Sequence, residues 1–421
     1  MIKVNKPKIR FKNFNDSWSL RKLSDTQTDF KDGNYGEAYP KETDLTSSTQ
    51  GVPFLRGSDL DNGKLTLTNA RYITQSKHNE LISGHLIEDD IVIAVRGSLG
   101  SLGYVGPDNE GWNINSQLAI IRTRKIEIIG NYLIQFLLSN RGGKEISSHI
   151  TGTALKQLPI KQLKSIKIPI PTLTEQQAIG SLFRLLDDLL ASYKDNLANY
   201  QSLKATMLSK MFPKAGQTVP EIRLDGFEGE WENIRLGDCA IIKGRLGWKS
   251  LKQEEYTEIG PSMIAGKHIK NGVIDWGEVD HIPQWRYDES PDIMLENGDI
   301  IFSKDGSLGN PALVSNLKGE ATINSTMMLV RLDKKVSSQF FYQVLTSSVF
   351  QKLIYLKVSG SSIPHLFQAD MQDFKFFAPC IEEQQAIGVY FSNLDNLINS
   401  HQEKISQLET LKKKLLQDMF I

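Results

Sequence analysis

The 421-residue sequence has few cysteines, no long apolar run and no excess of charge of one sign. Only Cys239 and Cys380 occur, without the spacing of a zinc site, which excludes a disulfide-rich framework and fits a reducing cytoplasm. No run approaches the roughly 20 apolar residues of a membrane-spanning helix, and the opening residues lack an apolar signal core. We therefore expect an unexported, cytoplasmic protein without a membrane partner.

The charges of the chain cancel. Lys and Arg together number 49, and Asp and Glu together also number 49. A formal charge of zero excludes a generic polybasic coat for nucleic acid, but it does not exclude a local binding site. Hydrophobic residues make up 40% and charged residues 23%, as is typical of a folded chain. At about 100 to 200 residues per domain, the length predicts two or three domains.

Recognisable catalytic patterns are also missing from the sequence. The glycines at 260–266 stand one residue too far apart for a P-loop, and His268 occupies the position where that loop needs Ser or Thr. No Gly-x-Gly-x-x-Gly marks a dinucleotide site, and the seven histidines are scattered without metal-ligand spacing. The sequence therefore predicts a binding protein without catalytic, cofactor-binding or metal-binding residues.

The most informative feature that is present is an internal repeat with a shift near 208 to 213 residues. Pro7-Lys-Ile-Arg-Phe returns as Pro220-Glu-Ile-Arg-Leu, and Glu175-Gln-Gln-Ala-Ile-Gly returns as Glu383-Gln-Gln-Ala-Ile-Gly. The two 49-residue blocks that contain the second match share 18 identities, whereas the rest of each repeat is more variable. A period above 200 indicates a tandem duplication of a whole domain with its connector.

The similar blocks have the pattern of long amphipathic helices. Pro169 and Pro171 precede the first one, and Thr174 with Glu175 offers a helix cap with an acid in the first turn. Apolar residues recur at steps of four and three for about five heptads, which corresponds to about 55 Å of coiled coil. Because such a helix needs a partner, we predict an antiparallel coiled coil of the two duplicates with pseudo-two-fold symmetry; packing on separate globular cores is the alternative. The predicted helix-pairing residues are Ile179, Phe183, Leu186, Leu190, Leu197, Ile387, Phe391, Leu394, Ile398, Ile405, Leu408 and Leu415.

The variable blocks have mixed character. Residues 91–95 and 299–302 follow turn-rich segments and resemble strands, whereas 131–139 and 339–356 have helical apolar spacing. We therefore predict an α+β fold class. A mixed α/β domain with a largely antiparallel sheet is duplicated in tandem, and a long helix follows each copy.

Together these motifs resemble the specificity subunit of type I restriction–modification systems. The resemblance rests on Ile-Arg-Leu-x-Gly-Phe-x-Gly-x-Trp at 222–231, on Pro-x-Leu-x-Glu-Gln-Gln-Ala-Ile at 171–179 and on its echo at 379–387. It spans essentially the whole chain. The first copy departs from the pattern at residues 12–16, where Lys-Asn-Phe-Asn-Asp replaces Asp-Gly-Phe-Glu-Gly, which loosens where that domain begins.

The resemblance implies a non-catalytic subunit of an adenine-N6 DNA methyltransferase and ATP-dependent endonuclease complex. Target recognition domains at 1–170 and 214–378 would each read one half of a bipartite site in double-stranded DNA. Spacer helices at 171–213 and 379–421 would set the gap and dock two modification subunits, which bind S-adenosylmethionine. Restriction subunits would bring ATP and Mg. A coiled-coil scaffold that assembles partner proteins without reading DNA is the alternative, and a complete enzyme with an unrecognised active site is disfavoured.

The charge of each variable block bears on how DNA would be held. Residues 1–145 carry 19 basic and 17 acidic side chains, and residues 214–382 carry 18 basic and 23 acidic ones. Because non-specific affinity follows the number of phosphate charges neutralised, we expect this chain alone to bind DNA poorly. The modification subunits would then supply most backbone contacts, while base reading depends on geometry rather than net charge.

Candidate base-reading residues lie in loops at equivalent places of the two copies. These are the segment before each Asn-Gly, each Gly-Ser-Leu-Gly loop and a later Thr/Ser-rich loop, together with a basic-aromatic cluster found only in the second copy. For any one residue the alternative is a polar side chain that only caps a turn. The candidates are Arg56, Ser58, Asp59, Arg96, Ser98, Thr151, Thr153, Lys156, Arg245, Trp248, Lys249, Lys267, His268, Lys304, Ser307, Ser359, Ser361 and His365.

Overall fold

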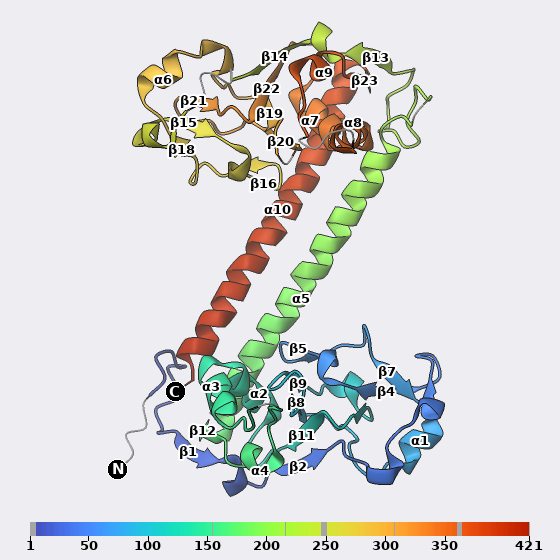
Figure 1. Cartoon of the computed structure of the whole chain (residues 1–421), viewed down its shortest axis with the longest axis vertical. Helices are drawn as coiled ribbons and strands as arrows, with labels where there is room; N and C mark the ends of the chain where they lie inside the picture. Colours follow the sequence, from blue (N-terminus) through green and yellow to red (C-terminus); the bar gives the residue numbers. More distant parts are fainter. Residues whose placement is uncertain are drawn as a thin grey trace. The chain divides into compact units, whose positions relative to one another are not determined.

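The chain folds into two units in a computed structural model. The first unit comprises Met1–Tyr193 and Lys404–Ile421, and the second comprises Lys194–Glu403. Each unit therefore contains one variable block and parts of both long helices (Figure 1). The structure describes residues 6–153, 155–214, 216–245, 251–306, 308–359 and 364–420.

The strands of the first unit are divided among several sheets, where the sequence led us to expect one. The main sheet is antiparallel, with the order β2 (Asp29–Asp32), β11 (Leu118–Arg122), β8 (Ile91–Ala94) and β9 (Leu102–Tyr104). A second sheet has the order β10 (Asn113–Ile114), β4 (Val52–Leu55), β7 (Arg71–Ile73) and β3 (Leu45–Thr46), and its β10–β4 pair is parallel. Two antiparallel pairs complete the set: β1 (Ser19–Lys22) with β12 (Lys167–Ile170), and β5 (Leu60–Asp61) with β6 (Lys64–Leu65).

The continuous apolar run of β8 reflects its position between two cores. Successive side chains of a strand point to opposite faces of the sheet. Ile91 and Ile93 belong to the core that includes the helices, whereas Val92 and Ala94 belong to the core beneath the second sheet. Both faces of the strand are therefore buried. The helices of this unit are α1 (Gln75–Glu80), α2 (Gly130–Leu138), α3 (Asn140–Ser148) and α4 (Ile160–Leu163).

The second unit repeats this arrangement. Its main antiparallel sheet has the order β14 (Ala240–Gly244), β22 (Met327–Leu332), β19 (Ile300–Ser303) and β20 (Gly309–Leu313). A second sheet has the order β18 (Asp280–His281), β15 (Thr257–Ile264) and β21 (Ala321–Ile323), and its β15–β21 pair is parallel. Two antiparallel pairs follow: β13 (Glu232–Arg235) with β23 (Lys375–Ala378), and β16 (Ile269–Lys270) with β17 (Val273–Ile274). The helices are α6 (Gln284–Asp288), α7 (Ser338–Thr346), α8 (Ser348–Ser359) and α9 (Gln368–Gln372).

The helical spacing at 339–356 is confirmed, and it corresponds to two helices. They are α7 and α8, which are separated at Ser347. The hydroxyl of Ser347 donates to the carbonyl of Val344 at 2.7 Å, so a side chain takes over a backbone partner at this break. The mixed helix and strand content that defines the α+β class is confirmed.

The two similar blocks form long helices, α5 (Leu173–Lys210) and α10 (Ile381–Asp418), of 38 residues each. The predicted cap at Thr174 is wrong: the hydroxyl of Thr172 accepts the amide of Glu175 at 3.4 Å, so α5 begins earlier. Gly180 allows close approach to α2, because a Cβ there would lie 3.3 Å from Asn131. The repeated Ile-Gly of the motif therefore belongs to the docking of each helix on its own domain.

Within each unit, the start of one long helix lies with the end of the other. In the first unit, Phe183 of α5 stacks with Phe420, the second residue after α10, at 6.1 Å between ring centroids. In the second unit, the ring centroid of Phe391 of α10 lies 6.2 Å from that of Phe212, the second residue after α5. Of the predicted pairing residues, Leu197, Ile405, Leu408 and Leu415 are half-buried, and Ile179, Phe183, Leu186, Leu190, Ile387, Phe391, Leu394 and Ile398 are buried.

The burial of these residues combines the two packing modes that the sequence left open. Ile179 and Phe183 belong to the core of the first domain, and Ile387 and Phe391 belong to that of the second. Coiled-coil pairing along the whole helix stays a prediction. Among the described residues, no helix is both long and apolar enough to cross a membrane.

Candidate nucleic-acid interface

Backbone hydrogen bonds bring the predicted loops of the first unit together. The amide of Asn115 donates to the carbonyl of Leu55 at 2.8 Å, directly before the Arg56 turn. The amide of Val95, two residues before the Gly-Ser-Leu-Gly loop, donates to the carbonyl of Gln117 at 2.8 Å. The carbonyl of Val95 accepts the amide of Leu158 at 3.0 Å. All three predicted loops thus lie side by side, joined by a turn at Asn115-Ser116, a dipeptide that recurs as Asn324-Ser325 in the second copy.

The same bonds recur in the second unit. The amide of Asn324 donates to the carbonyl of Ile264 at 3.0 Å, and the amide of Lys304 donates to that of Thr326 at 2.9 Å. The carbonyl of Lys304 accepts the amide of Leu366 at 2.9 Å. Each of these residues is the repeat equivalent of one in the first unit. The duplication therefore extends to the loop cluster, although few of its side chains match.

Two of the candidates cap turns. Asp59 is 1% exposed and accepts the amide of Arg56 at 2.8 Å, and the guanidinium of Arg56 lies 3.6 Å from the same carboxylate. His268 is 2% exposed, and its Nδ1 accepts the amide of Ala265 at 3.0 Å. Burial lowers the pKa of His268, which favours the neutral imidazole that can accept this bond. In both turns the side chain that accepts the bond lies three residues after the amide that donates it. This spacing is that of a capping box and is visible in the sequence, so it could have indicated that both residues cap turns.

Arg245 is buried, and its guanidinium interacts with residues inside the second unit. Its Nε donates to the carbonyl of Ile323 at 3.1 Å, and its Nη1 lies 3.7 Å from Glu289. Burial lowers the pKa of its guanidinium, and the side chain is fully enclosed. Its predicted companions Trp248 and Lys249 lie outside the described residues, as do Ser307 and Ser361.

The first unit keeps several candidates open to solvent. Arg96 is exposed, and among the described residues its Nη1 donates to the carbonyl of Ser116 at 3.4 Å. Lys156 is exposed and makes no hydrogen bond or ion pair with the part of the chain that the structure describes. Thr151 is half-buried and bridges to Gln157. The other exposed candidates are Ser58, Ser98 and Thr153.

Three candidates of the second unit, Lys267, Lys304 and His365, lie close to aspartate carboxylates. Lys267 pairs with Asp280 at 2.9 Å, and Lys304 lies 3.5 Å from Asp305. Asp305 also contacts Nδ1 of His365. Ser359 is the last residue of α8. The acidic excess of this block therefore appears inside the loop cluster itself, where carboxylates neutralise the cations that could meet phosphate.

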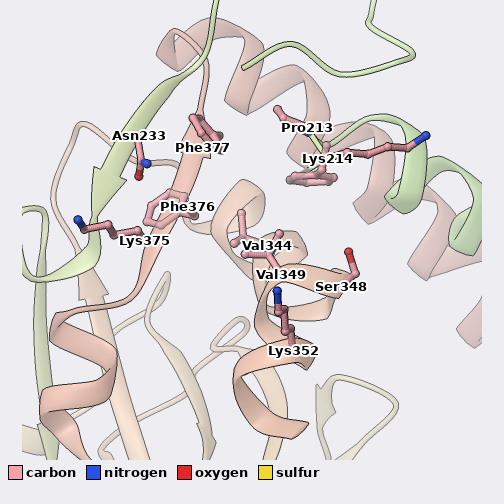
Figure 2. A pocket seen from close by; sticks show the side chains of 11 residues that line it. Pro213, Lys214, Asn233, Val344, Ser348, Val349, Lys352, Lys375, Phe376 and Phe377 are labelled. Carbon is pink, nitrogen blue, oxygen red and sulfur yellow. The ribbon is translucent and has the colours of Figure 1, made fainter. Parts of the chain in front are cut away.

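A separate pocket of the second unit contains none of these candidates. Its volume is about 570 Å³, and it lies among the end of α5, β13, α7, α8 and β23 (Figure 2). Apolar side chains dominate the lining, with three lysines among them. The lining residues are Phe212, Pro213, Lys214, Asn233, Val344, Ser348, Val349, Lys352, Lys375, Phe376 and Phe377. The described residues contain no group of three or more His, Cys, Asp or Glu side chains that could hold a metal ion.

Comparisons with known proteins match this duplicated architecture. A family model described as the type I restriction modification DNA specificity domain matches residues 17–199 and again residues 228–410. The putative type I restriction enzyme MjaX specificity subunit of Methanocaldococcus jannaschii is 24% identical over 411 residues, covering 95% of this chain and 92% of the relative. The MjaVIII specificity subunit of the same organism is 23% identical over 279 residues, covering 64% of this chain and 65% of the relative.

A solved structure supports the fold independently. The crystal structure of a type I restriction–modification system S subunit from M. genitalium matches 99% of both chains with a TM-score of 0.68 at 18% identity. At this identity the match shows a shared fold. The family model covers most of the chain in two copies, one for each recognition domain. The resemblance noted in the sequence is thereby confirmed, and the chain belongs to the family of type I restriction–modification specificity subunits.

Proposed function

We propose that this chain directs a type I restriction–modification complex to a bipartite DNA site, with each recognition domain reading one half. The observation that carries the proposal is the pair of equivalent loop clusters, built on the same backbone bonds but with different side chains. Two recognition domains with different loop side chains would bind two different half-sites. Their separation on one chain would fix the distance between the half-sites, as it does in dimeric DNA-binding proteins. A scaffold that does not read DNA is not favoured, because both copies match a DNA specificity domain.

In the first domain, the exposed loop residues divide by the contacts they suit. Arg96 suits guanine in the major groove, because its planar guanidinium can donate two parallel bonds to one base edge. Within the described part of the chain, its side chain donates one long hydrogen bond, to the Ser116 carbonyl, which leaves most of its donors available. Lys156 suits a phosphate, which positions the protein without carrying sequence information. Ser58, Ser98, Thr151 and Thr153 supply short hydroxyl donors in the same cluster.

In the second domain, the proposed readers are Lys304, His365 and Lys267, each beside an acid. The buried residues Asp59, His268 and Arg245 are left out of the proposed set because they serve turns and the interior. The pairing of the remaining cations with carboxylates fits a domain that contributes base contacts more than backbone attraction.

The rest of the activity belongs to partner subunits. The long helices would set the gap between half-sites and dock two modification subunits, which would bring S-adenosylmethionine to the target adenine. Restriction subunits would bring ATP and Mg for translocation and cleavage. The DNA substrate would place this work in the cytoplasm. Because the chain has no net charge, we expect these partners to supply much of the phosphate contact.

The test is base-resolution methylome sequencing of cells that produce the chain with modification subunits, beside a deletion control. We expect adenine methylation at a two-part motif that disappears with the deletion. Arg96→Ala should relax one position of one half-site, with a loss of about 1–3 kcal/mol in discrimination. Arg124→Ala removes an exposed arginine that lies 3.5 Å from Asp29, and it should leave the motif unchanged. Methylation at a short continuous motif, or none, would refute the proposal.

A further inference from the structure

The repeated Ile-Arg dipeptide of the first unit touches both long helices. The amide of Ile9 donates at 3.0 Å to the carbonyl of Asp418, the last residue of α10. The next residue, Arg10, donates through Nε and Nη2 to the two oxygens of Glu175 at 2.7 and 2.8 Å. Glu175 lies in the first turn of α5. Two consecutive residues therefore join the end of one helix to the start of the other, and we call this contact set clip 1.

The second unit contains the same device with the helices exchanged. The amide of Ile222 donates at 2.9 Å to the carbonyl of Lys210, the last residue of α5. Arg223 donates through Nε and Nη2 to Glu383, in the first turn of α10, at 2.8 and 2.6 Å. We call this set clip 2. Two repeated motifs of the sequence, Ile-Arg and the Glu that opens Glu-Gln-Gln, are thus the two halves of one contact.

The burial of these ion pairs shows what kind of contribution they make. The side chains of Glu175 and Glu383 are each 1% exposed, and those of Arg10 and Arg223 are 12% and 16% exposed. Removing one partner of a buried pair leaves a desolvated charge and is strongly destabilising. Replacing a whole pair by uncharged groups is often neutral for stability, because the desolvation cost disappears with it. Bidentate geometry instead restricts which arrangement of the helices can form.

Two further ion pairs between the helices agree with a single register. Lys412 pairs with Asp187 at 2.5 Å in the first unit, and Lys204 pairs with Asp395 at 2.6 Å in the second. Lys204 lies seventeen positions after Asp187, and Lys412 lies seventeen positions after Asp395. One antiparallel register therefore satisfies both pairs. A slip by one heptad in one direction would place Lys412 opposite Lys194, which carries the same charge.

We propose that clips 1 and 2 are positioning elements that fix the register of α5 against α10, and thereby the number of unread base pairs between the half-sites. The inference rests on the proposed function, because the gap has meaning only for a bipartite site. A role limited to folding makes a different prediction. In that case clip 1 would affect only the half-site read by the first domain, and clip 2 only the other.

The test removes each clip's ion pair without leaving an unpartnered charge. Arg10→Met with Glu175→Gln keeps an acceptor for the indole of Trp18, which donates to Glu175 at 3.0 Å. Arg223→Met with Glu383→Gln is the equivalent change in the second unit. Each variant, in complex with its modification subunits, methylates a plasmid library in which both half-sites are fixed and the gap length varies. We expect both variants to read both half-sites, and methylation at gaps other than the native one to rise at least tenfold relative to the native gap.

A matched control uses a buried ion pair that does not touch either long helix. Arg122 donates to Asp90 at 2.8 and 2.7 Å, and the Asp90 side chain is 1% exposed. Arg122→Met with Asp90→Asn should leave the gap distribution unchanged. If either double variant fails to fold, Arg10→Lys or Arg223→Lys replaces it, because lysine keeps the charge but loses the bidentate contact.

The outcomes separate this inference from the proposed function. Native gap selectivity in folded variants overturns the role of the clips while the bipartite reading stands. A change confined to one half-site in each variant also overturns it. A wild-type complex that methylates no bipartite site refutes the proposed function itself.

Discussion

Asp59 and His268 fill equivalent turns with different chemistry. Each accepts the backbone amide three residues earlier, at 2.8 Å for Asp59 and 3.0 Å for His268. A carboxylate accepts this bond whenever it is ionised, whereas Nδ1 of the imidazole accepts it only without a proton. The turn before the Asn-Gly hairpin is therefore sensitive to mild acid in the second domain.

A pH series tests this difference. Because burial lowers the pKa of His268, the unfolded chain binds the proton at a higher pH than the folded chain does. The stability contributed by the neutral imidazole is present at higher pH, and it is lost as the pH falls below the ordinary histidine value of about 6.5. His268→Asn keeps an acceptor but removes the titration. By calorimetry from pH 7.5 to 5.5, the unfolding temperature of the wild type should fall more steeply than that of the variant.

The control is Asp59→Asn, which should not change the slope of unfolding temperature against pH over this range. Lys267 and Asp280 face the His268 ring, with Asp280 at 3.5 Å, and both remain in the variant. Parallel slopes for the wild type and His268→Asn would show that another group titrates.

The sequence predicted which loops of the two copies occupy equivalent positions, but not which of their side chains are buried. The repeat showed that the Arg56 turn and its counterpart at His268 occupy equivalent places, which the backbone bonds confirm. It could not show that Asp59 and His268 point inward, because burial depends on strands distant in the chain. The pairing of Arg10 with Glu175 was missed for the same reason, since 165 residues separate them.

Among the elements, the ends of the long helices have a role that the heptad pattern did not reveal. Met419 and Phe420 follow α10 and are buried in the core of the first unit, against Tyr132 and Phe136. Met211 and Phe212 follow α5 and are buried in that of the second, with Phe212 stacked on Phe340 at 5.6 Å. Met419 and Phe420 therefore belong to the core of the first unit.

Truncating each aromatic side chain should destabilise one unit only. Phe420→Ala and Phe212→Ala each remove a buried ring, which typically costs about 3–5 kcal/mol. By hydrogen exchange, Phe420→Ala should lose protection in α2 of the first unit, and Phe212→Ala in α7 of the second. The two variants serve as controls for each other. Equal loss of protection in both helices, from either variant, would contradict the assignment of each helix end to a separate core.

The sequence predicted that both long helices exist and roughly how long they are, but not the residues at which they begin and end. Apolar steps of four and three are local, so the heptads predicted both helices, and each runs 38 residues. Their ends depend on contacts made across the sequence: Thr172 caps α5, and Ile222 bonds to its last carbonyl. The break at Ser347 has a similar origin, because apolar spacing continues through it while the backbone bonds do not.

For the whole molecule, the zero net charge limits how strongly the chain alone can be attracted to DNA phosphates. The second domain carries more acids than bases, and its loop cations lie beside carboxylates. Binding that scaled with neutralised phosphates would therefore be weak for this chain alone. Specificity and attraction would be divided between subunits, so the sequence read can change with a few loop residues while the duplicated frame persists.

The spacing of the ion pairs allows a test of the helices as a ruler. Seven residues inserted into both helices, between Asp187 and Lys204 and between Asp395 and Lys412, move both pairs into one new shared register. The insertion adds about 10.5 Å at 1.5 Å per residue, which corresponds to about three base pairs at 3.4 Å each. We expect the unread gap to lengthen by up to this amount in the library assay. The same insertion in α5 alone leaves no register that satisfies both pairs, so methylation should be lost or its gap selectivity abolished. If the gap stayed unchanged with the paired insertion, the lengthened helices could not be what determines the distance between the half-sites.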